Sequence, residues 1–144
     1  MKVQQLSVFL ENKPGRLSAP CRLLAAADIS IVTLSLADTN QFGILRLIVR
    51  NHECAMELLK EAGFIVNVTE VVAVEVEDRP GGLAEVLEYV EKAGINVEYM
   101  YAFTAKNVDR AVLIFRFEDP DKAIAFLQSK GISVISDVDL FQRA

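Results

Sequence analysis

The sequence predicts an α+β fold in which one β-α-β-β-α-β unit occurs twice. The first observation is a short sequence motif, called here the repeated phrase, that occurs twice, 66 positions apart. Its copies are Asn12-Lys13-Pro14-Gly15-Arg16-Leu17 and Asp78-Arg79-Pro80-Gly81-Gly82-Leu83. The second is that later residues keep a matched spacing of 66 and then 68 positions. The third is that strand-type and helix-type apolar periods follow in the same order after each phrase. A fixed internal period of this length indicates a duplicated supersecondary unit.

The first copy opens with a strand, because Leu6, Val8 and Leu10 alternate with residues of the opposite face. Pro14 and Gly15 end this strand and start a helix, since proline is well tolerated in a first helical turn. The rest of the first copy shows apolar residues at helix or strand spacing, and glycine where a helix should end. They predict helices over 14–27 and 53–62 and strands over 29–37, 44–50 and 64–68.

The second copy repeats this order with matching apolar phase. It predicts strands over 72–76, 95–102, 110–117 and 132–141, a helix from residue 83 that Gly94 stops, and a helix over 119–130. This is the ferredoxin-like plan, in which both helices cover one face of a four-stranded antiparallel sheet. We therefore expect two tandem ferredoxin-like units, residues 1–68 and 69–144. Neither Pro nor Gly occurs between 64 and 78, so one copy's last strand should run into the next copy's first strand.

The change of spacing from 66 to 68 requires two extra residues between about Leu36 and Ile44, or in the matching part of copy two. Insertions collect in loops, so residues 38–43 and 106–109 are the expected turns. The opposite sheet face also carries apolar residues, which we expect to lie away from the helices: Phe9, Leu34, Leu36, Ile44 and Ile48. An uncovered apolar face is typical of a partner surface, within the chain or in a homodimer.

Composition narrows the class of protein. The formal net charge of −5 argues against nucleic acid, which requires clustered Lys and Arg. No run of 18 apolar residues would span a membrane, and the N-terminus has the pattern of a strand rather than a signal peptide. Cys21 and Cys54 are isolated, so neither a disulfide framework nor a metal site is expected. The expectation is a cytoplasmic protein without metal or cofactor.

Each repeated phrase lies where a strand ends and a helix begins. The first N–H groups of a helix lack intrahelical partners, and with the helix dipole they favour a carboxylate. Gly15 and Gly81 have no Cβ, so a ligand can approach the backbone closely. The same residues also suit ordinary turn and capping chemistry, which is the plainer alternative.

Polar side chains near the two phrases would complete such a site. The candidates are Asn12 and Asp78 before the turns and Ser30 and Asn96 at the starts of the next strands. Their oxygens could accept hydrogen bonds from an ammonium group. Donors for one end of a ligand and acceptors for the other are what a zwitterionic amino acid requires.

These residues resemble the ACT domain. The shared features are [Asn/Asp]-x-Pro-Gly-x-Leu after a strand and Gly-Ile-Asn-Val opening the next strand, and the resemblance covers the chain as two units in tandem. Copy one departs from the pattern with Asp28 and Ser30. The resemblance implies a regulatory module that binds a free amino acid at the interface of two ACT units, without catalysis. It implies these ligand-binding residues: Glu11, Asn12, Lys13, Pro14, Gly15, Arg16, Leu17 and Ser30, and Glu77, Asp78, Arg79, Pro80, Gly81, Gly82, Leu83 and Asn96.

Other classes of function fit the sequence less well. His52 is the sole histidine, and no catalytic triad or phosphate-binding loop is present, which argues against an enzyme. RNA-binding folds of this topology stack bases on strand aromatics, but Phe115 and Phe117 align with Leu47 and Val49 and should face the helices. A protein-interaction module without ligand remains the serious alternative. The expected partners are a small-molecule amino acid and either a second copy of the chain or a partner enzyme or regulator.

Overall fold

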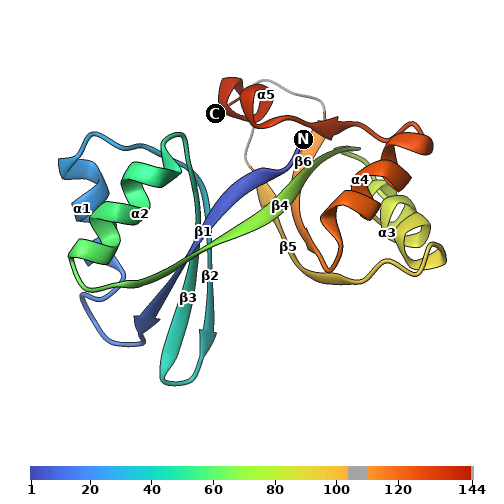
Figure 1. Ribbon diagram of the computed structural model, residues 1–144. Coiled ribbons are helices and arrows are strands. Elements are labelled where there is room, and N and C mark those ends of the chain that lie inside the picture. The colour runs from blue at the N-terminus through green and yellow to red at the C-terminus, as the bar shows by residue number, and fades with distance from the viewer. Residues whose placement is uncertain (104–109, 144) are drawn as a thin grey trace. The chain divides into compact units, whose positions relative to one another are not determined.

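The computed structural model describes residues 1–103 and 110–143 and divides into two compact units. The N-terminal unit is Gln4–Thr69, and the C-terminal unit combines Met1–Val3 with the chain from Glu70 onward. The β-α-β-β-α-β order occurs in both (Figure 1), which confirms the predicted tandem α+β fold. The predicted domain boundary at residue 68 stays a prediction.

The N-terminal unit packs two helices on one face of its sheet (Figure 1). Its elements are β1 (Val3–Glu11), α1 (Ser18–Ala26), β2 (Ile31–Thr39), β3 (Phe42–Val49), α2 (His52–Glu61) and the start of β4 (Ile65–Glu77). The strand order is β2-β3-β1-β4. The inward residues of β1 and β3 meet those of both helices in one core, of which Leu6, Leu24, Leu47 and Leu59 are fully buried.

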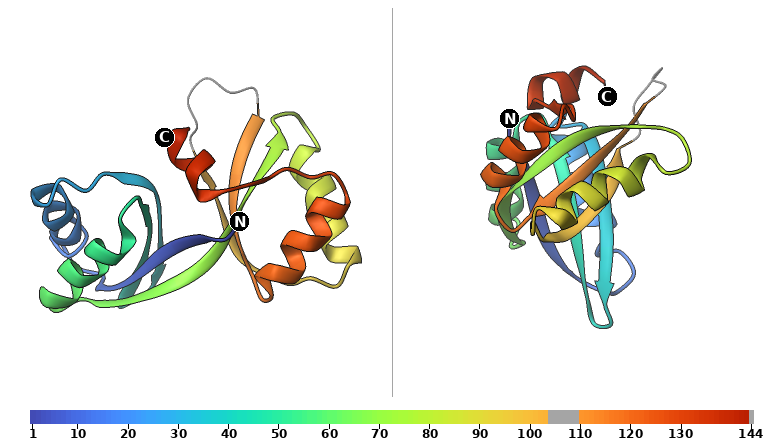
Figure 2. Two further views of the ribbon diagram at one scale, coloured as in Figure 1. Left: turned by 45° about the horizontal axis from the view of Figure 1, so that its top comes forward. Right: turned by 90° about the vertical axis from the view of Figure 1, so that its right-hand side faces the viewer.

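The C-terminal unit repeats the arrangement, with two helices on one sheet face (Figure 2). It continues β4 and adds α3 (Gly82–Lys92), β5 (Val97–Phe103), β6 (Arg110–Phe117), α4 (Pro120–Ser129), β7 (Val134–Ile135) and α5 (Asp137–Gln142). Strands β5, β6, β4 and β7 are neighbours in that order. Phe115, Phe117 and Leu127 are fully buried in its core, as expected for residues that face the helices.

The two copies also agree in the pairing register of their strands and in the position of a register shift. Leu6 pairs with Leu47 in the N-terminal unit, and the equivalent Val72 pairs with Phe115 in the C-terminal unit. Both copies also shift register at the same place, between Ile31 and Thr33 and, 66 positions on, between Val97 and Tyr99. The first expected turn is present between Thr39 and Phe42, which pair with each other. The second, at 106–109, lies outside the described residues.

The expectation that Leu34 and Leu36 lie away from the helices was wrong. Leu34 pairs with Leu47 and Leu36 with Leu45, and both partners are buried in the helix-covered core. Directly opposed residues of an antiparallel pair point to the same face, so Leu34 and Leu36 lie on the helix side. They remain about half exposed because β2 is the edge strand of its sheet.

The prediction of a strand over 132–141 was also wrong. Only Val134–Ile135 is strand, and α5 follows. The Ser136 hydroxyl oxygen accepts a hydrogen bond from the Asp139 N–H at 3.2 Å, and two aspartates occupy the first turn, which is capping chemistry that favours a helix. Leu140 is fully buried, and Arg143 reaches the Glu75 carboxylate of β4 at 2.7 Å.

Asp28 ends α1 in a conformation that suits glycine, with φ 59°, where the second copy has Gly94 with φ 69°. The Ile29 N–H donates to the Leu24 carbonyl at 2.9 Å, which completes a Schellman-type end. Because a left-handed conformation is costly for residues with a Cβ, we expect Asp28→Gly to raise the free energy of unfolding by about 0.5 kcal/mol. Urea denaturation followed by far-UV circular dichroism measures this. Gly94→Ala should lower the same quantity, and equal stability of all three proteins would contradict the prediction.

Candidate functional site

The turn after β1 is held by its own backbone. Gly15 has φ +85°, the Arg16 N–H donates to the Lys13 carbonyl at 3.2 Å, and the Ala19 N–H donates to the Gly15 carbonyl at 3.3 Å. A positive φ cannot belong to a right-handed helix, which rules out the predicted start at Pro14. The helix α1 begins at Ser18. The Ser18 hydroxyl also donates to the Gly15 carbonyl, at 3.2 Å.

This geometry leaves backbone donors unused at the start of α1. Among the described residues, the N–H groups of Gly15, Leu17 and Ser18 have no acceptor, and no side chain caps the helix. An added Cβ at Gly15 would meet nothing within 4 Å, so the space beside this residue is open. The turn therefore presents N–H groups and the positive end of a helix dipole to an accessible region.

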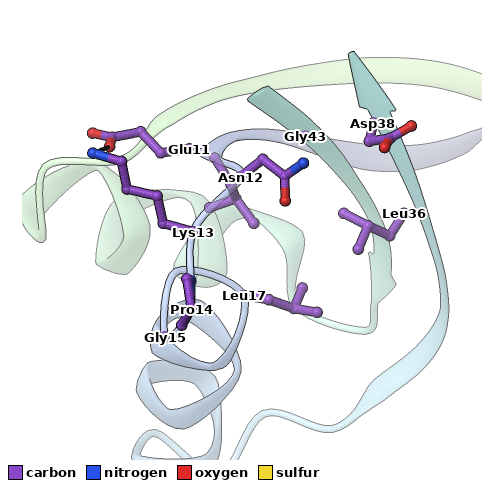
Figure 3. Close-up of a pocket in the computed structure, with 10 residues that line it drawn as sticks. Glu11, Asn12, Lys13, Pro14, Gly15, Leu17, Leu36, Asp38 and Gly43 are labelled. Atoms are coloured by element: carbon purple, nitrogen blue, oxygen red, sulfur yellow. Dashed lines mark ion pairs between the residues drawn. The ribbon is translucent and has the colours of Figure 1, made fainter. Parts of the chain in front are cut away.

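A cavity of about 390 Å³ lies between this turn and the ends of β1, β2 and β3, and Gly15 is one of its lining residues (Figure 3). We call it the turn cavity. It is lined by Leu10, Glu11, Asn12, Lys13, Pro14, Gly15, Leu17, Leu36, Asp38 and Gly43. Leu17 and Leu36 approach it from opposite sides (Figure 3). Gly43 pairs with Leu10 and with Asp38, so these three residues share the face of the sheet that carries the helices.

The charged residues of the turn cavity are not equivalent. Lys13 Nζ lies 3.1 Å from Glu11 Oε2, and this hydrogen bond with Lys13 lowers the pKa of the Glu11 carboxyl. The Asp38 carboxylate, by contrast, has no ion-pair or hydrogen-bond partner within the described part of the chain. Asn12 donates from Nδ2 to the Asn40 carbonyl at 3.0 Å, which fixes its amide and leaves Oδ1 as an acceptor. The carboxylate of Asp38 and the amide oxygen of Asn12 therefore border the cavity as hydrogen-bond acceptors.

The matching turn of the C-terminal unit has the same backbone but is crossed by Arg79. The Gly82 N–H donates to the Arg79 carbonyl and the Glu85 N–H to the Gly81 carbonyl, both at 3.0 Å. The Arg79 guanidinium bonds both oxygens of Glu85 at 2.9 Å and also pairs with Glu77. These carboxylates raise the pKa of Arg79, and Arg79 lowers that of Glu77.

This arginine occupies the approach that is open in the first copy. An added Cβ at Gly81 would lie 3.7 Å from Arg79 Nη1, whereas the same atom at Gly15 would meet nothing. The residue that matches Glu85 in the first copy is Ala19, which cannot hold a cation. The two turns therefore share a backbone and differ in access.

The predicted site residues of the first copy do not all line the turn cavity. Six of them, Glu11 to Gly15 together with Leu17, line the turn cavity. Arg16 lines a neighbouring cavity of about 300 Å³ instead. Ser30 precedes β2 as an exposed residue and is not part of the turn cavity lining.

In the C-terminal unit the predicted residues are spread over several places. Glu77 and Gly82 line a cavity of about 130 Å³, and Asn96 lines a different one beside Gly94. The remaining predicted residues are exposed in the turn and at the start of α3: Asp78, Arg79, Pro80, Gly81 and Leu83.

Four lining residues of the turn cavity were missed by sequence reasoning: Leu10, Leu36, Asp38 and Gly43. Leu36 was assigned to the wrong face, and Asp38 and Gly43 were taken as turn residues only. The sequence did contain a signal for the face of Leu36, because a two-residue turn at Asn40 and Gln41 sets the register that opposes Leu36 to Leu45.

Among the described residues, no group of His, Cys, Asp or Glu could hold a metal ion. The helices described are also too short or too polar to span a membrane.

The chain is similar to several known proteins. The family model described as "ACT domain pair" matches residues 1–144. The crystal structure of protein BT0572 from Bacteroides thetaiotaomicron is 39% identical, with a TM-score of 0.91 over 98% of this chain and 96% of that one. The ligand-free regulatory subunit of aspartate kinase from Thermus thermophilus is 16% identical, with a TM-score of 0.62 over 88% and 91% of the two chains, and shows likeness of fold. No curated protein matches the chain.

Proposed function

The chain belongs to the ACT domain family as a tandem pair, and on that premise we propose that it is a regulatory sensor that binds a free amino acid in the turn cavity. The single observation that carries the proposal is the cavity itself. Its volume of about 390 Å³ lies within the range of small-molecule sites, and it is bordered by N–H donors and a carboxylate that have no partner among the described residues.

The arrangement suits a zwitterion in one orientation. The N–H groups of Gly15 and Leu17, with the dipole of α1, favour the ligand carboxylate. The Asp38 carboxylate and Asn12 Oδ1 favour its ammonium group. A site with acceptors at one end and donors at the other would reject an amine or a simple carboxylic acid, each of which leaves half of the polar groups unpaired.

The test is a thermal shift of the whole chain against the twenty amino acids. A ligand at 100 times its Kd should add roughly 2.7 kcal/mol to the free energy of unfolding, which raises the Tm by several degrees. Gly43→Val should abolish the shift, because Gly43 lies in strand geometry and its added methyl groups would fill the cavity floor. The first added carbon would lie 3.4 Å from Leu36 Cδ1 and 3.6 Å from the Ala37 carbonyl oxygen, which are van der Waals contacts.

The matched control is Ala111→Val, which enlarges the equivalent residue of the C-terminal unit and should leave the shift intact. If no amino acid moves the Tm of the wild-type chain, or if Gly43→Val keeps the full shift, the proposed site is wrong. The predicted placement at an interface of two units, the cytoplasmic location and the lack of catalysis stay predictions.

A protein-interaction module is the second candidate, and exposed apolar side chains of the N-terminal unit favour it. Phe9, Phe42 and Ile65 are 41%, 51% and 67% exposed and line one cavity with Arg16. A ligand-independent partner surface would bury these residues. Failure of all twenty amino acids in the thermal assay makes this candidate the leading one.

A further inference from the structure

We infer that the ligand is an amino acid with an aliphatic side chain of about the size of leucine, and that each chain binds one such molecule, in the N-terminal unit. This inference rests on the proposed function, since it specifies the ligand class of the same cavity. Its basis is the chemistry of the cavity wall and the difference between the two copies.

The turn cavity has an apolar wall in addition to the backbone N–H donors of the turn. Leu17 and Leu36 are 43% and 49% exposed, and they face the cavity from α1's entry turn and from β2 (Figure 3). Leu10 and Gly43 form the adjoining floor. Two half-exposed leucines that meet across a cavity leave apolar surface in water, and an aliphatic side chain between them would remove it.

The charged groups around the cavity do not suit an ionised ligand side chain. Lys13 is paired with Glu11, so neither is available without breaking a 3.1 Å contact. Asp38 is the remaining charge of the lining, and the ligand ammonium would use it. An aspartate or lysine ligand would place its second charge beside leucines, where an unpaired charge is costly.

The second copy keeps Leu83 at the position of Leu17, but it differs from the first copy at the opposite wall, at the floor and in access to the turn. The residues that match Leu36 and Gly43 are Ala102 and Ala111, so the wall is shorter and the floor carries a methyl group. Arg79 crosses the turn between Glu77 and Glu85. One binding event per chain follows from this asymmetry.

Isothermal titration calorimetry with leucine, isoleucine, valine, alanine, serine, aspartate and lysine tests the inference. Leucine or isoleucine should bind most tightly, at one molecule per chain, and aspartate and lysine should not bind. Leu36→Ala should weaken leucine binding by about tenfold and alanine binding much less, because the lost contacts are with the longer side chain. Leu34→Ala is the matched control, since Leu34 lies on the same strand and face outside the cavity lining and should leave the Kd unchanged.

The possible outcomes distinguish an error in the ligand class or site number from an error in the proposed function. Tight binding of aspartate, lysine or serine that Gly43→Val abolishes would overturn the aliphatic class and leave the proposed sensor function standing. Two molecules per chain would overturn the single site. Equal effects of Leu36→Ala and Leu34→Ala would show that Leu36 does not touch the ligand. No binding of any amino acid would overturn the proposed function itself.

Discussion

Phe115→Ala should lower the free energy of unfolding of the C-terminal unit by about 4 kcal/mol. The Phe115 ring is fully buried and stacks on the ring of Phe117, with centroids 5.2 Å apart and an interplanar angle of 7°. Truncation removes the apolar surface of the whole ring and opens a cavity that the strands on either side cannot close. The loss of the ring pair adds to this cost.

The chain offers its own reporter for this measurement. It contains no Trp, and its three tyrosines, Tyr89, Tyr99 and Tyr101, all lie in the C-terminal unit. Urea denaturation followed by tyrosine fluorescence therefore reports on the unit that carries the substitution. Phe115→Leu is the control, because the matching residue of the first copy is Leu47, and its cost should be below about 1.5 kcal/mol. A loss of less than 1 kcal/mol for the alanine variant would contradict this account of the core.

The duplicated pattern made most of the fold predictable. Strand β6 begins and ends where the apolar alternation and Asp119 indicate, and Asp119 caps α4 by accepting a hydrogen bond from the Lys122 N–H. The unbroken β-forming stretch before Asp78 is one strand, β4. Local signals sufficed here because apolar period, capping residue and stop signal agree in both copies.

Tertiary register was harder to predict than the elements themselves. The face of Leu36 depends on which residue of β3 it opposes, and a slip of one position reverses every side chain of a strand. The strand pattern at 132–141 was outweighed by the Ser136 cap and the acidic first turn, a signal that the sequence contains.

The candidate site was predicted in part for the same reason. The repeated phrase located the residues of the turn, which are neighbours in sequence. It could not show that Arg79 bridges Glu77 and Glu85 while Lys13 pairs with Glu11 alone, because those contacts depend on the side-chain conformations of the folded turn. The opposite wall of the cavity, Leu36 and Asp38, comes from a strand about 20 residues away and needed the register of the sheet.

Gly82→Ala is expected to destabilise the protein by about 3 kcal/mol, although it adds one methyl group. Gly82 is buried, and an added Cβ would collide with the carbonyl oxygen of Glu77, so backbone must move on one side or the other. The matching residue of the first copy is the exposed Arg16, which shows that the open turn accommodates a side chain at this position.

Arg16→Ala is thus the matched control and should change the free energy of unfolding by less than about 0.5 kcal/mol. Urea denaturation with tyrosine fluorescence and circular dichroism measures both variants. Similar costs for the two substitutions would mean that the turns are packed alike, contrary to the structure. A large cost at Gly82 alone would support a closed, packed turn in the C-terminal unit and an open turn in the N-terminal unit, which is the asymmetry that single-site binding requires.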